Sequence, residues 1–336
     1  MQVRIFTEGG GDIGLGHIAR CCSLYEELAG RGVPVEFFIY GEISGISILK
    51  DKRVRNTNWI SCDYLKTHIM DSDTCIVDSY LATEKLYQII AAKAKKALYI
   101  DDNRRIEYPK GMIVRPSFYP CVGDHAYKGE GMYVDKYKDH LYLTGAKFIL
   151  LRGEFSDAYK ELGKSRTGEV LITMGGTDIR NLTPRIVDHL CVKHSDIKLH
   201  IVLGKDPPEP LREKKPEHVN YYSNIDAGLM KELMLQSQFA ITAAGQTLYE
   251  LLATGTPFIA IEVIENQKDH VRAIREHIPG MPIIAYQDRF FLEKLEAEFD
   301  TMLRLSREED FRKLYTGLVD GRGSKRIVDA LLSFEL

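Results

Sequence analysis

The sequence lacks any apolar run approaching the roughly 20 residues that a membrane-spanning helix requires, which argues against a membrane span. The apolar start at residues 1–6 is too short for a signal peptide and is soon followed by glycines, from Gly9 onward. Neither sign of charge is in clear excess, because 45 Lys and Arg against 48 Asp and Glu give a formal charge of -3. That balance offers no electrostatic reason to expect a nucleic acid partner. We therefore expect a cytoplasmic protein with no membrane span and no nucleic acid partner.

Closely spaced cysteine pairs are also missing. The six cysteines include the adjacent Cys21 and Cys22 but no C-x-x-C motif, and none has a histidine at zinc-finger spacing. A disulfide framework is unusual in a chain of 336 residues, and a structural zinc site lacks its ligands. We expect reduced, mostly buried thiols, no metal and no other cofactor.

The chain does contain enough length and apolar sequence for two domains. Its 336 residues exceed what one hydrophobic core usually serves, and 44% hydrophobic with 28% charged residues is typical of a globular protein. Strand-like runs alternate with helical periodicity in the first half, and the pattern restarts in the second. The expected strands are residues 3–6, 33–39, 74–77, 97–100, 112–114, 169–174, 198–203, 239–242 and 258–261. The expected helices include residues 17–30, 84–96 and 246–253.

Alternation of this kind indicates parallel sheets covered by helices on both faces. We predict an α/β fold of two doubly wound, Rossmann-like domains that face a cleft, at residues 1–155 and 169–323. The polar residues 156–168 are the predicted linker, and residues 324–336 are expected to form a helix packing back across the hinge. Ligands in such folds bind where the strands end.

A glycine-rich loop follows the first expected strand and leads into a helix. Residues 9–17 read Gly-Gly-Gly-Asp-Ile-Gly-Leu-Gly-His, and such glycines let backbone N–H groups approach a ligand closely. No Gly-Lys-Ser/Thr follows, so the loop is not a P-loop, and Ile13 interrupts a G-x-G-x-x-G fingerprint. His17 stands at the positive end of the helix, which disfavours imidazolium and favours a neutral base. The alternative is a flexible turn without a chemical role.

Two loops in the second half are suited to a nucleotide. Gly176 and Thr177 follow a strand and could seat a phosphate, the alternative being a tight turn with a capping residue. Residues 242–247 deliver small side chains to the start of a helix, and Glu250 lies one turn inside it. A carboxylate there can accept both ribose hydroxyls while the preceding amides hold a pyrophosphate. Alternatively, Glu250 is an ordinary solvated helix residue.

Together these segments resemble the UDP-sugar hydrolases of pseudaminic acid biosynthesis and the related spore-coat polysaccharide proteins, which have the glycosyltransferase-B fold. The most specific match is residues 174–182, Met-Gly-Gly-Thr-Asp-Ile-Arg-Asn-Leu. The other matching stretches are residues 13–17, 77–80, 100–102, 151–155 and 244–267. They occur in the family's order over roughly residues 1–267.

The resemblance implies hydrolysis of UDP-2,4-diacetamido-2,4,6-trideoxy-β-L-altropyranose to the free sugar and UDP, without a metal. Such a step belongs to the synthesis of a pseudaminic-type nonulosonic acid or a surface polysaccharide. By the same resemblance His17 activates the water. The residues implied on the sugar side are Asp12, Gly14, Gly16, Tyr80, Asn266 and Gln267. The residues implied on UDP are Gly176, Thr177, Ala244, Gly245, Gln246, Thr247 and Glu250.

Three functions stay open on the sequence. They are hydrolysis, glycosyl transfer to an acceptor hydroxyl, and nucleotide-sugar binding without catalysis, and UDP-binding residues serve all three equally. The loop histidine favours catalysis, and the lack of a basic, apolar membrane-facing patch argues against a lipid-linked acceptor. Two departures from the family pattern, Phe6 in place of an arginine and residues 115–117 in place of an Asn-rich turn, leave the sugar open. A monomer and a dimer are both compatible with the sequence.

Overall fold

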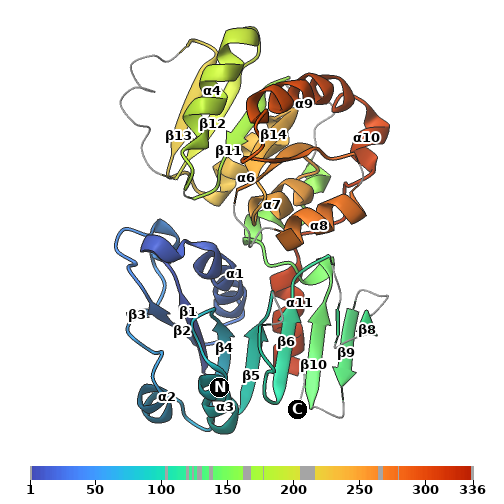
Figure 1. Cartoon of the computed structure of the whole chain (residues 1–336). Coiled ribbons are helices and arrows are strands. Elements are labelled where there is room, and N and C mark those ends of the chain that lie inside the picture. Colours follow the sequence, from blue (N-terminus) through green and yellow to red (C-terminus); the bar gives the residue numbers. More distant parts are fainter. Residues whose placement is uncertain are drawn as a thin grey trace. The chain divides into compact units, whose positions relative to one another are not determined.

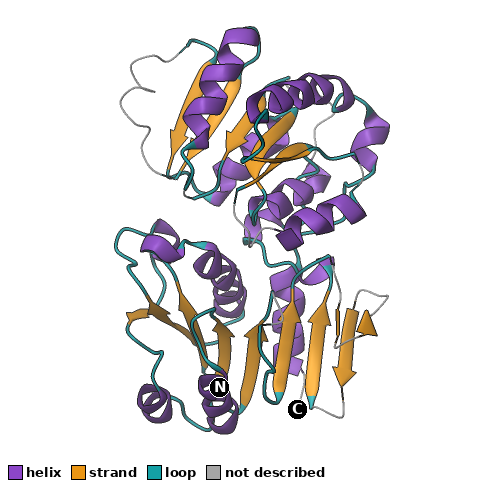
Figure 2. Ribbon diagram, viewed as in Figure 1, coloured by secondary structure: helices purple, strands orange, loops and turns teal. Residues whose placement is uncertain are grey.

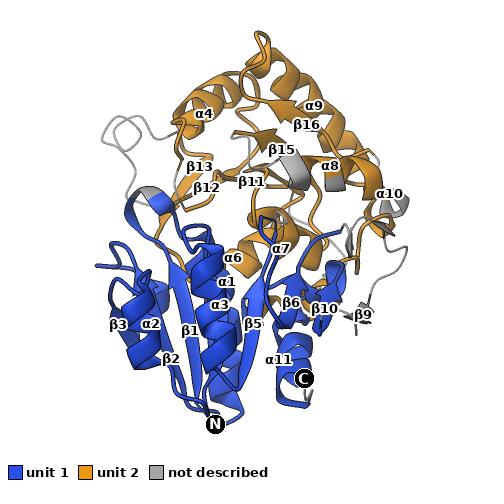
Figure 3. Cartoon of the chain, turned by 60° about the horizontal axis from the view of Figure 1, so that its bottom comes forward, with its two compact units in different colours: residues 1–153, 321–336 blue, residues 154–320 orange. Residues whose placement is uncertain are grey.

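The strand–helix alternation forms two separate sheets in the computed structural model of the chain. The structure describes residues 2–102, 105–118, 121–122, 125–126, 131–135, 139–161, 168–176, 178–204, 216–263, 268–278 and 280–333. Residues 1–153 together with 321–336 make up the first unit, and residues 154–320 make up the second (Figure 3). Each unit is a sheet covered by helices (Figures 1 and 2), as the alternation predicts. The expected class of two doubly wound α/β domains is confirmed, and the cleft between them stays a prediction.

The first unit is organised around an eight-stranded sheet in the order β3-β2-β1-β4-β5-β6-β10-β9. Its strands are β1 (Val3–Glu8), β2 (Val35–Tyr40), β3 (Val54–Asn56), β4 (Thr74–Asp78), β5 (Lys96–Ile100), β6 (Gly111–Arg115), β9 (Gly131–Asp135) and β10 (His140–Thr144). Neighbouring strands are parallel except for β9 and β10. A short antiparallel pair, β7 (Cys121–Val122) and β8 (His125–Ala126), also occurs. The order of strands reverses between β1 and β4, the switch point at which doubly wound sheets bind ligands.

Both faces of this sheet are buried because consecutive side chains of β1 point to opposite sides. Ile5 joins a core with Ile18 of one helix and Ile327 of another, whereas Phe6 packs on the other face with Trp59 and Tyr87. The helices are α1 (Gly16–Gly30), α2 (Cys62–His68), α3 (Glu84–Lys93) and α11 (Gly323–Ser333). The helix expected near the C-terminus is therefore present and packs on α1 within the first unit. Its position relative to a hinge stays a prediction.

The second unit contains a six-stranded, fully parallel sheet in the order β13-β12-β11-β14-β15-β16. Its strands are β11 (Val170–Thr173), β12 (Leu199–Leu203), β13 (Val219–Ser223), β14 (Phe239–Ala243), β15 (Phe258–Glu262) and β16 (Ile283–Ala285). Its helices are α4 (Leu182–Lys193), α6 (Ala227–Gln236), α7 (Thr247–Ala253), α8 (Lys268–His277), α9 (Phe291–Leu305) and α10 (Glu309–Lys313). Ile186 of α4 and Phe299 of α9 share a core with Ile172 of β11. The order of strands reverses here between β11 and β14, which makes a second switch point.

Short 3₁₀ turns complete the elements. They are η1 (Gly11–Ile13), η2 (Ser47–Leu49), η3 (Ala146–Phe148), η4 (Gly153–Phe155) and η5 (Ala158–Glu161). The expected linker, residues 156–168, begins within the second unit, where η5 contacts α6 and α7. Residues 162–167 of that stretch lie outside the described residues. The boundaries predicted for the two domains stay predictions.

The thiols are as expected from the spacing of the cysteines. Cys21, Cys22 and Cys75 are buried, and all five cysteines whose side chains the structure describes are free. The expected helix at residues 84–96 is shorter than predicted, because α3 ends at Lys93 and β5 begins at Lys96. No helix within the described ranges is both long and apolar enough to cross a membrane.

Candidate active site

The glycine-rich loop follows β1 and places His17 at the C-terminal ends of the strands of the first sheet. Gly10 and Gly14 both have φ of 85°, and Gly10 N–H donates to the Gly14 carbonyl at 2.8 Å. A Cβ on Gly10 would lie 1.7 Å from the Glu42 carbonyl oxygen, so this tight turn requires glycine. Helix α1 begins immediately afterwards at Gly16. His17, the second residue of α1, is thereby held next to the switch point of the sheet, and it is 8% exposed.

Asp78 is the direct partner of His17. It is the last residue of β4, is fully buried, and its Oδ1 lies 2.8 Å from His17 Nδ1. Burial on its own raises the pKa of the Asp78 carboxyl, but the Arg20 charge and the His17 contact outweigh burial and lower that pKa well below its usual range. An ionised carboxylate can only accept, so we assign the shared proton to Nδ1. The Nε2 lone pair of His17 is then left to accept a proton.

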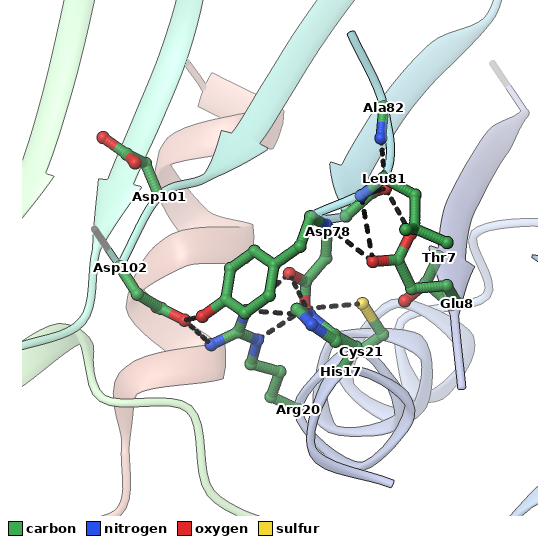
Figure 4. A network of polar contacts seen from close by, with 12 residues as sticks. Thr7, Glu8, His17, Arg20, Cys21, Asp78, Leu81, Ala82, Asp101 and Asp102 are labelled. Atoms are coloured by element: carbon green, nitrogen blue, oxygen red, sulfur yellow. Dashed lines mark hydrogen bonds and ion pairs between the residues drawn. The ribbon is translucent and has the colours of Figure 1, made fainter. Parts of the chain in front are cut away.

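Arg20 links Asp78 to a second carboxylate. It lies one turn after His17 on the same face of α1, and its Nε and Nη2 donate to Asp78 at 2.5 and 2.6 Å. Its Nη1 donates to Asp102, two residues after β5 (Figure 4). Burial lowers the pKa of Arg20, but the two carboxylates outweigh it and raise that pKa well above its usual value.

Tyr80 covers the other side of His17. Its hydroxyl donates to Asp102 Oδ2 at 2.9 Å, and its ring meets the imidazole edge-on with 4.5 Å between centroids. Burial, followed by the Asp102 charge, raises the pKa of Tyr80 above its usual value, so the phenol is a neutral donor. Tyr80 is 40% exposed, which leaves part of its ring available to a ligand.

Glu8 holds the turn that carries Tyr80. The Glu8 side chain is buried at the end of β1 and accepts the hydroxyl of Ser79 and the backbone N–H groups of Tyr80 and Leu81, the latter two at 2.6 and 3.2 Å. Ala82 N–H in turn donates to the Ser79 hydroxyl at 2.9 Å. Glu8 therefore determines where Tyr80 lies relative to His17, although it touches neither side chain in the contacts just described.

The Gly176 loop follows β11 in the second unit. Gly175 has φ of 81°, and a Cβ on Gly204 would lie 1.9 Å from the Gly176 carbonyl oxygen. The Asp178 carboxylate accepts the N–H groups of Leu182 and Thr183 at 2.9 and 2.7 Å. Asp178 therefore caps the first turn of α4. This is the capping residue expected if the loop is a tight turn. Thr177, which was predicted to contact phosphate, lies outside the described residues.

The third loop connects β14 to α7 at the switch point of the second sheet. Ala244 is buried and its N–H donates to the Ile261 carbonyl at 2.8 Å, while Gly245 N–H donates to Ala243 at 2.8 Å. Gln246 precedes α7, and Thr247 is its first residue. Glu250 is only 8% exposed, so the alternative of a solvated helix residue is wrong. Burial of a carboxylate needs polar partners.

The structure brings the predicted residues together in two groups, one at each switch point. Gly14, Gly16, His17 and Tyr80 lie at the edge of the first sheet. The second group consists of Gly176, Ala244, Gly245, Gln246, Thr247 and Glu250. Asn266, Gln267 and the Asp12 side chain lie outside the described residues.

Sequence reasoning missed the roles of Glu8, Arg20, Asp78 and Asp102. A signal was present, since Asp78 and Asp102 follow consecutive expected strands whose ends meet at one edge of a parallel sheet. Among the side chains that the structure describes, no group of three or more His, Cys, Asp or Glu is arranged to hold a metal ion. The carboxylates beside His17 are instead bound to Arg20.

Known proteins related to the chain agree with the resemblance seen in its motifs. No protein-family model matches the chain. An uncharacterized protein of Methanocaldococcus jannaschii, MJ1062, is 30% identical over 80% of this chain and 57% of its own length. The Helicobacter pylori pseudaminic acid cytidylyltransferase and UDP-2,4-diacetamido-2,4,6-trideoxy-β-L-altropyranose hydrolase is 27% identical over 80% of this chain and 45% of its own length. The chain thus spans about half the length of these two relatives.

A third relative matches along its whole length. The spore coat polysaccharide biosynthesis protein SpsG of Bacillus subtilis is 24% identical over 98% of both chains. The predicted relationship to the pseudaminic acid hydrolases and the spore-coat proteins is confirmed by these matches.

Solved structures establish the fold family. MurG of Acinetobacter baumannii superposes with a TM-score of 0.61 at 13% identity, over 99% of this chain and 100% of its own. The spinosyn rhamnosyltransferase SpnG complexed with thymidine diphosphate has a TM-score of 0.63 at 14% identity, with the same coverage. At such identities the likeness concerns the fold alone, and that fold is of the glycosyltransferase-B type.

Proposed function

We propose that the chain is a nucleotide-sugar enzyme that hydrolyses a UDP-activated diacetamido-trideoxy sugar to the free sugar and UDP. This reaction would serve the synthesis of a pseudaminic-type nonulosonic acid or a surface polysaccharide. The names of the relatives and the fold support the broader class of nucleotide-sugar chemistry. The observation that carries hydrolysis is the His17–Asp78 pair, 2.8 Å apart at the switch point of the first sheet.

In the proposed step His17 is the general base. Its Nε2 accepts a proton from water while the water oxygen forms a bond to the anomeric carbon, and the bond from that carbon to the diphosphate oxygen breaks. UDP leaves with the electron pair of that bond. Asp78 keeps the Nδ1 proton in place and stabilises the imidazolium that forms. A positioned base of this kind contributes about 10²–10⁴-fold to a rate.

The nucleotide is proposed to bind to the second unit. Glu250 would accept the ribose hydroxyls, because it is a buried carboxylate one turn into the helix that follows β14. The backbone at Gly176 would face the diphosphate, as amides commonly do at strand ends, and Gly245, whose N–H already donates to Ala243, would line the site without donating to the diphosphate. The proposed UDP contacts are Gly176, Thr177, Ala244, Gly245, Gln246, Thr247 and Glu250. The proposed sugar contacts are Asp12, Gly14, Gly16, Tyr80, Asn266 and Gln267.

Glycosyl transfer is the second candidate, and a specific feature of the first unit favours it. Ile13 and Leu15, just before His17, are each 39% exposed, and Leu81, just after Tyr80, is 46% exposed. Apolar side chains next to a base would suit an acceptor with an apolar part, whose hydroxyl would replace water. Binding without catalysis would leave the buried His17–Asp78 pair without a role.

A panel of UDP-sugars tests the proposal. The protein is incubated with each sugar nucleotide, with and without an acceptor glycan, and UDP release is followed together with the free sugar by NMR. Hydrolysis predicts both products without acceptor, and the His17→Asn variant serves as the control for contaminating activity. Release only in the presence of acceptor would replace hydrolysis by transfer. Binding of UDP with no release under either condition would leave the non-catalytic function.

A further inference from the structure

Charged side chains from three places in the first unit surround His17. Helix α1 contributes Arg20, β4 contributes Asp78 at its end, and Asp102 follows β5. Among these groups Arg20 supplies the permanent positive charge, because a guanidinium does not lose its proton in proteins. Among the described residues, the other titratable groups in contact with this network or next to it in the chain include Glu8, Cys21, Tyr80, Asp101 and Arg105.

Arg20 is placed between the two carboxylates and the imidazole. Its Nη2 lies 2.6 Å from Asp78 Oδ1 and 3.0 Å from His17 Nδ1, while Nη1 donates to Asp102. Asp78 Oδ1 therefore accepts from both Arg20 and His17. Because Nδ1 already carries the proton that it donates to Asp78, the approach of Nη2 to Nδ1 is an approach of positive charge to a donor. Such an approach opposes further protonation of the ring.

We infer that Arg20 is a positioning residue whose fixed charge prevents Asp78 and Asp102 from holding His17 as imidazolium. It has a second effect, since its two hydrogen bonds to Asp78 aim one carboxylate oxygen at Nδ1 and so select the ring form with a free Nε2 lone pair. The importance of Arg20 for turnover rests on the proposed function. The effect of Arg20 on the charge of His17 is independent of the proposed function.

A count of formal charges shows why Arg20 is needed. Asp78, Asp102 and Arg20 together carry one net negative charge, and without Arg20 they carry two. Without the guanidinium, the buried Asp78 and the partly buried Asp102 would attract a proton to the imidazole, and imidazolium cannot serve as a base. At the protein surface, solvent would screen such charges and they would hardly change the protonation of a neighbouring imidazole. Here the screening is weak, because Asp78 is fully buried and the Arg20 side chain is only 10% exposed.

The test is an NMR titration of the His17 imidazole in the full chain, which needs no substrate. We expect Arg20→Gln to move the midpoint of the titration to higher pH by about one to three pH units, because a charge close to the ring is removed. Arg20→Lys, which keeps the charge, should move the midpoint much less. Arg31→Gln is the matched control at the C-terminal end of the same helix, since Arg31 pairs with Glu27 and Asp329 instead.

Asp102→Asn covers the case in which Arg20→Gln does not fold. This change removes a negative charge and leaves Arg20 to Asp78 alone, so the midpoint should move to lower pH. An unchanged midpoint in folded Arg20→Gln, or in Asp102→Asn, would overturn the inference.

The acid limb of the rate against pH separates the inference from the proposed function. With the proposed substrate, that limb should move in Arg20→Gln by the same amount as the NMR midpoint, with little change in KM. If the midpoint moves but His17→Asn retains normal turnover, the proposed function fails and the inference about charge stands. If His17→Asn loses turnover and the midpoint does not move in Arg20→Gln, the inference fails and the function stands.

Discussion

The carboxylate of Asp78 lies 2.8 Å from Nδ1 of His17, although 61 positions separate the two residues in the chain. The contact arises because β1 and β4 are neighbours in the sheet, so the helix that follows β1 begins beside the residue that ends β4. A histidine with one nitrogen held by an ionised carboxylate presents its other nitrogen in a defined direction. This pair is therefore the feature on which the predictions about catalysis depend.

Replacing His17 by asparagine should lower turnover by about 10²–10⁴-fold, since the base that accepts the proton of water is lost. UDP affinity should barely change, because the proposed nucleotide contacts are in the second unit. In the unmodified protein, turnover should fall toward acid pH because imidazolium cannot accept a proton. Turnover and calorimetric UDP affinity are measured across pH for both proteins. If His17 served as a cation for phosphate, the variant would bind UDP more weakly, and the unmodified protein would bind it better at low pH.

Stability below neutral pH should depend on Asp78. The pKa of its carboxyl is lower in the folded than in the unfolded chain, so ionised Asp78 stabilises the fold fully above about pH 4. This contribution is lost progressively as the pH falls below that value toward the folded pKa, because protonation then favours the unfolded state. Urea unfolding of the unmodified protein should therefore lose more free energy between pH 5 and 3 than unfolding of Asp78→Asn. Parallel losses in the two proteins would contradict the prediction.

Replacing Glu8 by alanine should displace Tyr80 and destabilise the protein. The change removes the acceptor of two backbone N–H groups and one hydroxyl, and an unsatisfied buried group costs about 1–3 kcal/mol. Thermal unfolding measures the stability, and turnover reports the position of Tyr80. Ser79→Ala is the milder comparison, because it leaves both backbone N–H groups on Glu8. A Glu8→Ala protein with unchanged stability and unchanged turnover would show that the turn holds itself.

Replacing Glu250 by alanine should weaken UDP binding by about 1–3 kcal/mol, because the ribose hydroxyls would lose their acceptor. Calorimetry of UDP against the variant measures the loss. Glu293→Ala is a suitable control, since Glu293 is an exposed carboxylate on α9. Unchanged affinity in Glu250→Ala would mean that the nucleotide binds elsewhere.

The Cys22 thiol should be unreactive in the folded protein. Burial raises its pKa to about 12, more than the Lys52 charge lowers it, so almost none of the reactive thiolate is present at pH 8. An aromatic disulfide reagent should modify Cys22 only after unfolding in urea, and peptide mass mapping identifies the modified site. Cys62, which is partly exposed, serves as the internal comparison. Modification of Cys22 as fast as that of Cys62 would contradict the prediction.

The sequence by itself determined the elements and the class of fold. Alternation of apolar runs with helical spacing is a local property, and it predicted β1, β4, β11 and β14 to within one or two residues. It missed β3, β9, β13 and β16, which lie at the edges of their sheets, and the interior β10, because none of these strands presents a long apolar run in the sequence. The glycines before His17 were also readable, since a tight turn admits few other residues.

Only the tertiary structure decided which polar side chains meet. The motif around residues 77–80 marked Asp78 as part of a pattern, but its partnership with His17 depends on the order of strands in the sheet, which no local signal encodes. The same holds for Arg20, whose position on α1 predicts a polar helix face and not a bridge between two carboxylates. The burial of Glu250 was likewise decided by packing. Pairing across a parallel sheet joins residues distant in the chain, and the physical reason is that strand order follows from the burial of whole faces rather than from any one residue.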